Sequence, residues 1–121
     1  MMILSLETVV DGNRDIQFVA IGDHGDGGKL LGRVCLGFGN TGKQSAWLYQ
    51  LFVAEEYRRR GIGKALVDEC IREARRLGEM VIALSIPDAR NNEKLIEYYG
   101  SFGFGITFCH DDGGVTMSKI L

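Results

Sequence analysis

The chain has 121 residues, of which 45% are hydrophobic and 25% are charged, the proportions of an ordinary soluble protein. This length fits a single domain, residues 1–121, and the net charge of -2 argues against general binding to nucleic acid. No stretch approaches the ~18 consecutive apolar residues of a membrane-spanning helix, and the N-terminus lacks the basic region and cleavage site of a secretory signal. We therefore expect a cytoplasmic protein whose partners include neither a membrane nor a nucleic acid.

The first half of the chain predicts strands. Four segments alternate or run apolar and are rich in branched and aromatic side chains, which favours strands over residues 2–10, 15–22, 30–38 and 45–53. The segments between them are rich in glycine, aspartate and asparagine, which predicts turns at residues 11–13, 23–28 and 40–43.

The second half of the chain predicts helices that alternate with strands. Apolar residues at helical spacing predict an amphipathic helix near 61–77, and Gly78 follows as its C-cap. The segment 80–86 is apolar except for one serine, which favours a buried strand parallel to the strand before the helix. A second helix is expected from about Asn91 to Tyr99, and a last pair of strands at 102–109 and 114–120. This order predicts an α/β domain with a mixed sheet.

The most unusual segment joins the strand at 45–53 to the first helix. We call residues 58–65, with the sequence Arg-Arg-Arg-Gly-Ile-Gly-Lys-Ala, the basic loop. Its four cations stand at a helix N-terminus that already carries about +0.5 of an elementary charge, so they destabilise the free protein. Unpaired amides, glycines that permit close approach and basic side chains together favour the binding of a phosphate. The alternative is a solvated loop whose charge is balanced by Glu55, Glu56 and Asp68.

Two other segments resemble known sites less well. The pattern of a P-loop is nearly matched over 37–44, but Gln44 stands where a hydroxyl should bind magnesium, and a strand rather than a helix follows. The segment Asp23-His24-Gly25-Asp26 lacks the spacing of an EF-hand, so we expect no metal site. The three cysteines form no CxxC motif, and each lies in an apolar pattern that predicts a small core residue: Cys35, Cys70 and Cys109.

Two motifs together resemble the GNAT acetyltransferase superfamily. The first is [RQ]xxGx[GA], which is matched by Arg58, Gly61 and Gly63 directly after a strand. The second is N-x-x-A-x-x-L-Y-x-x-x-G-F, which the chain follows in register over 92–104, with Leu95 at the position of the small residue and Tyr98 at the position of the leucine. The resemblance covers roughly residues 45–121. It implies a mixed, mostly antiparallel sheet with a central parallel β-α-β unit and a second helix, and it implies acetyl-CoA as co-substrate.

The resemblance also implies which residues hold acetyl-CoA. The strands matching 45–53 and 80–86 would splay apart, and the pantetheine arm would lie between them and bond to the backbone of Leu51 and Val53. A free amide near Leu51 or Phe52 would polarise the thioester carbonyl. The pyrophosphate would be held by the Arg58 side chain and by the amides of Arg59, Arg60, Gly61, Ile62, Gly63, Lys64 and Ala65.

Two residues of the second motif are candidates for catalysis. By resemblance, Tyr99 would give a proton to the departing CoA thiolate, while an acceptor amine attacks the thioester directly in a ternary complex. The alternative is that Tyr99 is only a core aromatic residue. Asn92 would bond to the cofactor arm or a nearby water, and its alternative role is that of a helix cap. We expect the neighbouring Tyr98 to serve packing.

The chain departs from the family in two respects. Gln50 stands near the position where many relatives carry a glutamate, so the general base is not evident. The first 44 residues predict hairpins without the helical segment that usually walls the acceptor site, and on this ground we expect an open acceptor site or a homodimer. The hypothesis is an acetyl-CoA-dependent N-acetyltransferase. The alternatives are a non-catalytic acyl-CoA-binding or interaction module on the same fold, and a phosphate-binding domain unrelated to CoA.

Overall fold

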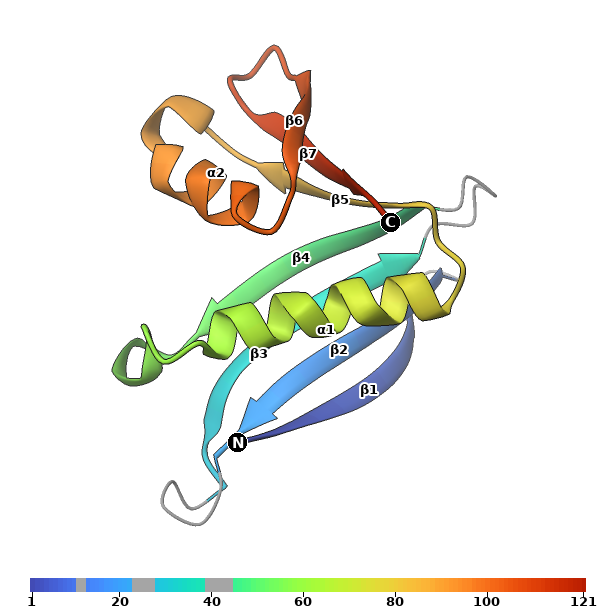
Figure 1. Cartoon of the computed structure of the whole chain (residues 1–121), viewed down its shortest axis with the longest axis vertical. Coiled ribbons are helices and arrows are strands. Elements are labelled where there is room, and N and C mark those ends of the chain that lie inside the picture. Colours follow the sequence, from blue (N-terminus) through green and yellow to red (C-terminus); the bar gives the residue numbers. More distant parts are fainter. Residues whose placement is uncertain (11–12, 23–27, 39–44) are drawn as a thin grey trace.

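The computed structural model describes residues 1–10, 13–22, 28–38 and 45–121. These residues form one seven-stranded sheet in the order β1-β2-β3-β4-β5-β7-β6, with two α-helices (Figure 1). The strands are β1 (Met2–Val10), β2 (Asn13–Ile21), β3 (Leu30–Phe38), β4 (Ser45–Val53), β5 (Val81–Ile86), β6 (Gly105–Cys109) and β7 (Val115–Ile120). The helices are α1 (Ile62–Arg76) and α2 (Glu93–Gly100), with short 3-10 turns η2 (Glu55–Tyr57) and η3 (Ala89–Asn91).

The topology confirms the mixed sheet that was predicted. Neighbouring strands pair antiparallel except β4 and β5, which are parallel and are joined by α1. The last strand pair was predicted to begin at 102, but β6 begins at Gly105, because a turn through Gly103 (φ 97°) ends α2 first. The two 3-10 turns were not predicted. β1 ends at Val10 and β2 begins at Asn13, which leaves no length for a helix between them.

The sheet is split between β4 and β5. These strands pair only over Ser45–Trp47 and Val81–Ala83, so the rest of β4 has no strand partner on that edge. A bulge lies in the same part of β4, where the register with β3 shifts and Gln50 takes a positive φ of 54°. Gly32 on β3 permits this close approach, because a Cβ there would lie 2.7 Å from the backbone oxygen of Phe52. The split confirms the splayed strands that the resemblance implied.

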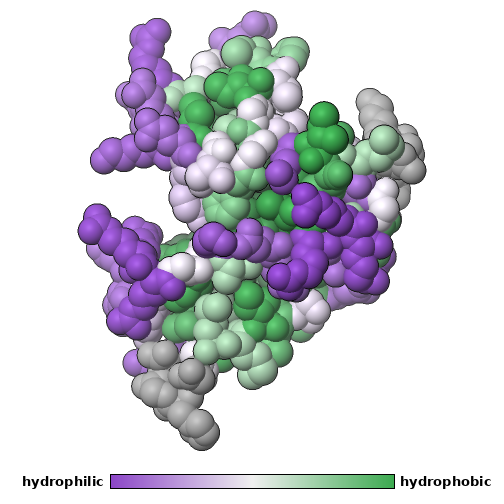
Figure 2. Space-filling model, viewed as in Figure 1, coloured by the Kyte–Doolittle hydropathy of each residue, from purple (hydrophilic) through white to green (hydrophobic). Residues whose placement is uncertain are grey.

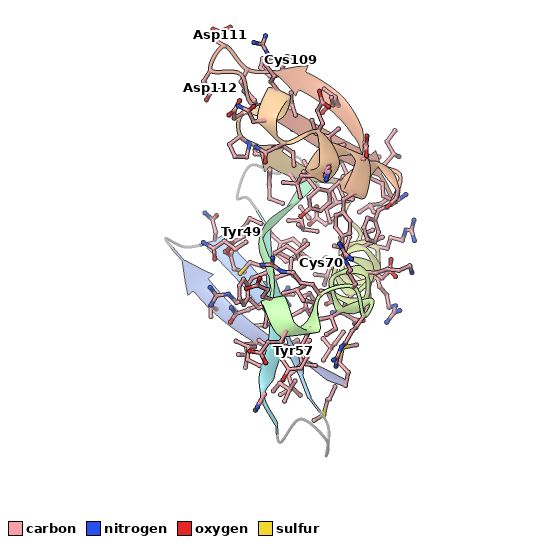
Figure 3. All side chains as sticks on the ribbon, turned by 90° about the vertical axis from the view of Figure 1, so that its left-hand side faces the viewer. Tyr49, Tyr57, Cys70, Cys109, Asp111 and Asp112 are labelled. Atoms are coloured by element: carbon pink, nitrogen blue, oxygen red, sulfur yellow. The ribbon has the colours of Figure 1, made fainter. Side chains whose placement is uncertain are left out.

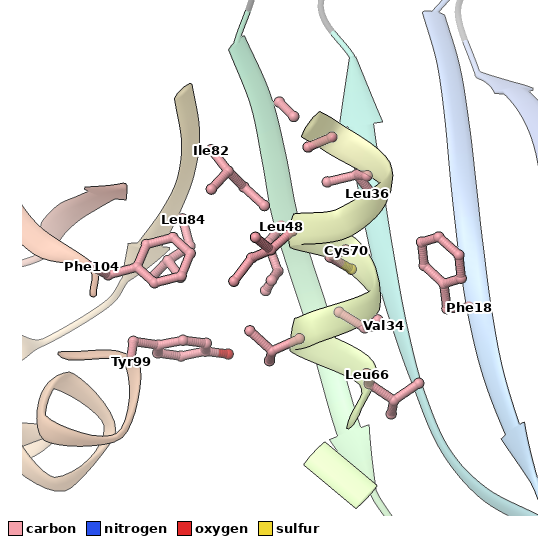
Figure 4. Close-up of a cluster of buried hydrophobic side chains, with 14 of the residues drawn as sticks. Phe18, Val34, Leu36, Leu48, Leu66, Cys70, Ile82, Leu84, Tyr99 and Phe104 are labelled. Atoms are coloured by element: carbon pink, nitrogen blue, oxygen red, sulfur yellow. The ribbon is translucent and has the colours of Figure 1, made fainter. Parts of the chain in front are cut away.

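Each helix covers one part of the sheet. The buried face of α1 packs on β2, β3 and β4, and α2 lies beside β5 and β7 (Figure 1). Helix α1 ends as predicted, because Gly78 (φ 80°) donates its amide to Arg75 and the Glu79 amide bonds to Ala74, which satisfies the last carbonyls. The core between these layers is apolar, and Figure 4 shows part of it: Phe18, Val34, Leu36, Leu48, Leu66, Cys70, Ile82, Leu84, Tyr99 and Phe104.

No helix in the described part of the chain covers the other face of β1 to β4, which we call the open face. Because side chains alternate along a strand, every second residue of these strands points away from α1 and lies on the open face. Figure 3 shows Tyr49 on this side of the sheet and Cys70 of α1 on the other. The large exposed apolar and aromatic side chains of this face are Met2, Leu4, Leu6, Trp47, Tyr49 and Phe52.

Several sequence predictions fall outside the described residues. The turn residues 11–12, 23–27 and 40–43, the Asp23-His24-Gly25-Asp26 segment and most of the P-loop-like segment belong to this group. Cys35 and Cys70 are buried free thiols as predicted, but Cys109 is exposed, because β6 is an edge strand. Among the residues that the structure describes, no helix is long and apolar enough to cross a membrane, and no cluster of side chains suits a metal ion.

Candidate functional site

A groove of about 450 Å³ lies where the end of β4, the basic loop and α2 meet. In Figure 2 the outline of the molecule is notched between α2 and the basic loop, and hydrophilic side chains cover the solvent side of α1. The groove has an apolar part along β4 and a basic part at the start of α1. Its lining residues are Leu51, Phe52, Val53, Tyr57, Arg58, Arg59, Gly61, Ile62, Gly63, Lys64, Leu95 and Tyr98.

The start of α1 presents unpaired amides to this groove. Gly61 caps the helix in the left-handed conformation (φ 78°), and no side chain accepts a hydrogen bond from the first turn. The first helical bond runs from the Ala65 amide to the Gly61 carbonyl at 3.0 Å, so the three preceding amides have no helical acceptor. The amide of Ala65 is therefore already used, and Ala65 does not line the groove, contrary to its predicted place in the phosphate site.

The basic side chains of the loop differ in what they contact. Arg58 donates from Nε to the Val53 carbonyl oxygen at 3.1 Å, and Lys64 pairs with Asp68 at 2.9 Å. The Arg60 guanidinium lies over the Tyr57 ring, 5.3 Å from its centroid, which takes it out of the groove lining.

Arg59 has no partner among the described residues. Glu55 and Glu56 pair with none of the three arginines, so among the cations of the basic loop only Lys64 is balanced by a carboxylate of the described chain. The alternative from the sequence, a loop whose positive charge is balanced by nearby carboxylates, is therefore met only in part. The charge of Arg58 and Arg59 is open to an anion from outside.

Strand β4 presents an unpaired edge to the same groove. Beyond Trp47 its backbone faces the split, and Leu51 and Val53 are half-buried there. An extended amide chain can bond to such an edge as a neighbouring strand would. The apolar side chains and this edge together form a channel that leads away from the helix start.

Tyr98 lines the groove, although only packing was expected of it. Its ring packs edge to face on Tyr99 and Phe102, at centroid distances of 5.3 and 5.2 Å. Its hydroxyl reaches the first turn of α1, since a Cβ at Gly63 would lie 2.7 Å from it. Burial, with a smaller effect of Asp68, raises the pKa of Tyr98, so it presents a protonated hydroxyl at the phosphate end of the groove.

Tyr99 is not among the groove-lining residues. Its side chain is 6% exposed and packs on Phe104, and Figure 4 shows its ring reaching from α2 toward α1 and Leu48. No described residue forms a hydrogen bond with its hydroxyl. Burial, ahead of the nearby Tyr98 and Cys70, raises the pKa of Tyr99 to about 12, so the hydroxyl keeps its proton.

Asn92 is also not brought to the groove. Its side-chain amide donates to the carbonyl oxygens of Pro87 at 2.7 Å and Asp88 at 3.0 Å, and it holds the turn that begins α2. Asn92 thus occupies the N-cap position of α2, which was the alternative to a cofactor role, but its side chain makes no capping hydrogen bond to the helix amides.

The structure thus brings nine predicted cofactor residues to one groove and leaves four outside its lining: Arg60, Ala65, Asn92 and Tyr99. Tyr57, Leu95 and Tyr98 line it as well and were not predicted to do so. Leu95 and Tyr98 lie one helical turn apart on α2, so the helical period was the signal that could have found them. No lining residue is an aspartate or glutamate, and the Gln50 side chain only accepts a long contact of 3.9 Å from the Cys35 thiol.

Comparison with known proteins places these features in a family. The model of the acetyltransferase (GNAT) family matches residues 5–104. The chain belongs to the GNAT family. Acetyl-CoA is the co-substrate of this family.

Solved structures of the family share the fold of this chain at low sequence identity. The PaiA N-acetyltransferase of Thermoplasma acidophilum, in complex with coenzyme A, superposes with a TM-score of 0.74 at 22% identity, over 88% of this chain and 61% of that one. Nourseothricin acetyltransferase superposes with a TM-score of 0.73 at 22% identity, over 98% of this chain and 84% of that one. The IAA acetyltransferase of Bacillus cereus superposes with a TM-score of 0.72 at 18% identity, over 88% of this chain and 78% of that one. The present chain is therefore shorter than each of these relatives. Comparison with curated protein sequences gave no match.

Proposed function

We propose that this GNAT protein transfers the acetyl group of acetyl-CoA to a primary amine by direct attack in a ternary complex. The observation that carries the proposal is the groove itself, which joins unpaired helix amides and free arginines to an open strand edge. A pyrophosphate suits the first part, and a pantetheine arm with its amides suits the second.

Each part of the groove has a distinct task in this proposal. Arg58, Arg59 and the amides of Ile62 to Lys64 bind the pyrophosphate, and the Tyr98 hydroxyl donates to it from α2. The edge at Leu51 and Val53 orients the arm. An amide beside the bulge stabilises the negative charge that develops on the thioester oxygen. The acceptor nitrogen bonds to the carbonyl carbon, the carbon–sulfur bond breaks, and Tyr99 protonates the leaving thiolate. The proton that the acylated nitrogen loses passes to water, and Tyr99 regains a proton from water.

The test is calorimetric titration of acetyl-CoA into the wild type and into the Arg58→Ala/Gly61→Ala variant. Loss of a charge-assisted hydrogen bond and strain at a left-handed position should weaken binding by at least about tenfold. Arg72→Ala is the matched control, because Arg72 is an exposed arginine of α1 that pairs with Glu69 outside the groove. No binding by the wild type, or equal binding by the double variant, would contradict the proposal.

The second candidate is a non-catalytic acyl-CoA-binding module. It is favoured by the groove lining, which contains no carboxylate that could serve as a base. A colorimetric assay of free CoA thiol against a panel of amines separates the two functions. Amine-dependent release of CoA supports transfer, and tight binding without any release supports the module.

The remaining parts of the proposal concern assembly and location. We propose a single domain over residues 1–121, a cytoplasmic location and a homodimer that uses part of the exposed apolar surface of β1. A monomeric mass by light scattering at micromolar concentration would count against the dimer.

A further inference from the structure

A polar cluster lies on the open face, beside its exposed aromatic side chains. Asp15 of β2, Cys35 of β3 and Tyr49 of β4 point to the same side, and the Tyr49 hydroxyl donates to the Asp15 carboxylate. The tyrosine thus crosses β3 to reach β2. It does so over Gly37, where a Cβ would lie 3.3 Å from both the Asp15 carboxylate and the Tyr49 ring.

Asp15 has no cationic partner in the described chain. Tyr49 bonds to one carboxylate oxygen, and the other oxygen accepts no hydrogen bond from a described residue. Arg33 is the cation on this face of the described strands, but its guanidinium lies over the Phe52 ring, 5.9 Å from the centroid. The oxygen of this half-buried carboxylate that Tyr49 does not contact can accept a charge-assisted hydrogen bond from a cation outside the chain.

The position of the Asp15 carboxylate sets the length that an acceptor must have to reach both this carboxylate and the split in the sheet. Asp15 is in register with Gly37 and Trp47, and β4 still pairs with β5 at Trp47, so the split begins further along β4. Two strand steps of about 4.8 Å across the sheet, combined with the residues from Trp47 to the bulge at about 3.3 Å each, give a separation of ~14–16 Å from the carboxylate to the split beside the bulge. The ring of Tyr49 lies between the two points, and Trp47 is an exposed aromatic neighbour on the same face. Between the carboxylate and the split, the surface is therefore aromatic and suits a methylene chain.

We propose that Asp15, held in place by Tyr49, binds a second cationic group of the acceptor, so that the preferred acceptors are linear diamines or longer polycations. The inference rests on the proposed acetyl transfer and adds the class of acceptor. One amine reacts at the split beside the bulge, and the other pairs with Asp15. Asp15 takes no part in the bond changes and acts as a specificity residue, and Tyr49 acts as a positioning residue.

The test is a series of α,ω-diamines from ethylenediamine to diaminododecane, each beside the monoamine of equal length. For the wild type, kcat/KM should pass through an optimum at an intermediate length, where the diamine exceeds its monoamine by at least about tenfold. Asp15→Asn should bring that ratio close to one while the monoamine rates and the affinity for acetyl-CoA stay unchanged. Asp111→Asn, an exposed aspartate at the far hairpin, is the matched control.

The outcomes separate this proposal from the proposed function. Acetyl transfer with equal rates for diamines and monoamines, or a ratio that Asp15→Asn leaves unchanged, overturns the cation site alone. If no amine is acetylated, the transferase proposal fails. In that case calorimetry of the best-fitting diamine decides the site, since binding that Asp15→Asn abolishes supports it and absence of binding overturns it.

Discussion

Strand β4 presents a different chemistry on each side of the sheet. Toward α1 and α2 it borders a groove whose amides, arginines and strand edge come from one stretch of the chain, residues 51–64, with two additions from α2. On the open face its aromatic side chains meet residues from β2 and β3 that lie 10 or more positions away. The difference teaches that the groove side is built from residues close together in sequence, whereas the open face is assembled by strand register alone.

The largest effect expected is that of Tyr99→Phe, which tests whether this buried hydroxyl on the groove side of the sheet takes part in chemistry. Loss of a general acid should lower kcat by about 10²-fold or more, with acetyl-CoA affinity unchanged. Tyr98→Phe is the matched control, and it should weaken acetyl-CoA binding with a small effect on kcat, because its hydroxyl lies at the helix start. Steady-state kinetics and calorimetry measure both quantities. Unchanged turnover of Tyr99→Phe would remove Tyr99 from the mechanism.

An intermediate effect is expected at Gly32, the residue that lets the β4 bulge approach β3. A Cβ there would lie 2.7 Å from a backbone oxygen and 3.2 Å from Leu66, so Gly32→Ala should lower the free energy of unfolding by ~1–3 kcal/mol. Urea denaturation measures the change. Gly105→Ala serves as the control, because a Cβ at that strand position meets nothing within 4 Å. Equal stability of the two variants would show that the bulge tolerates the added methyl group.

The smallest effect is expected from thiol modification, which compares access on the two sides of β4 without altering activity. Cys109 is exposed and should react first with a thiol reagent. Cys35 lies on the open face but is nearly buried, so it should react more slowly. Cys70 is on the buried face of α1, where burial raises its pKa, so it should react only on unfolding. Mass spectrometry after timed labelling gives the order. Rapid labelling of Cys70 in the folded protein would contradict the close packing of α1 on the sheet.

Short-range patterns predicted most of the fold and the cofactor side. The basic loop, the C-cap at Gly78 and the parallel strand pair follow from residues close together in the chain. The orientation of the neighbouring side chains of Tyr98 and Tyr99 was harder to predict. Whether Tyr98 or Tyr99 faces the groove depends on the rotation of α2 against the sheet, which tertiary packing decides. The pairing of Asp15 with Tyr49 depends on the register of three strands and on space above Gly37, and no local pattern predicts either.

The brief pairing of β4 with β5 has a consequence for the stability of the whole sheet. Only three residues of each strand join the β1–β4 part to the β5–β7 part, so the amides along the split lack the protection that a full ladder gives. A ligand whose own amides bond along β4 would close this seam as an eighth strand. We therefore expect acetyl-CoA to slow hydrogen exchange in β4 and β5 and to raise the melting temperature in proportion to its saturation. In that sense the acyl donor would complete the sheet as well as supply the group that is transferred.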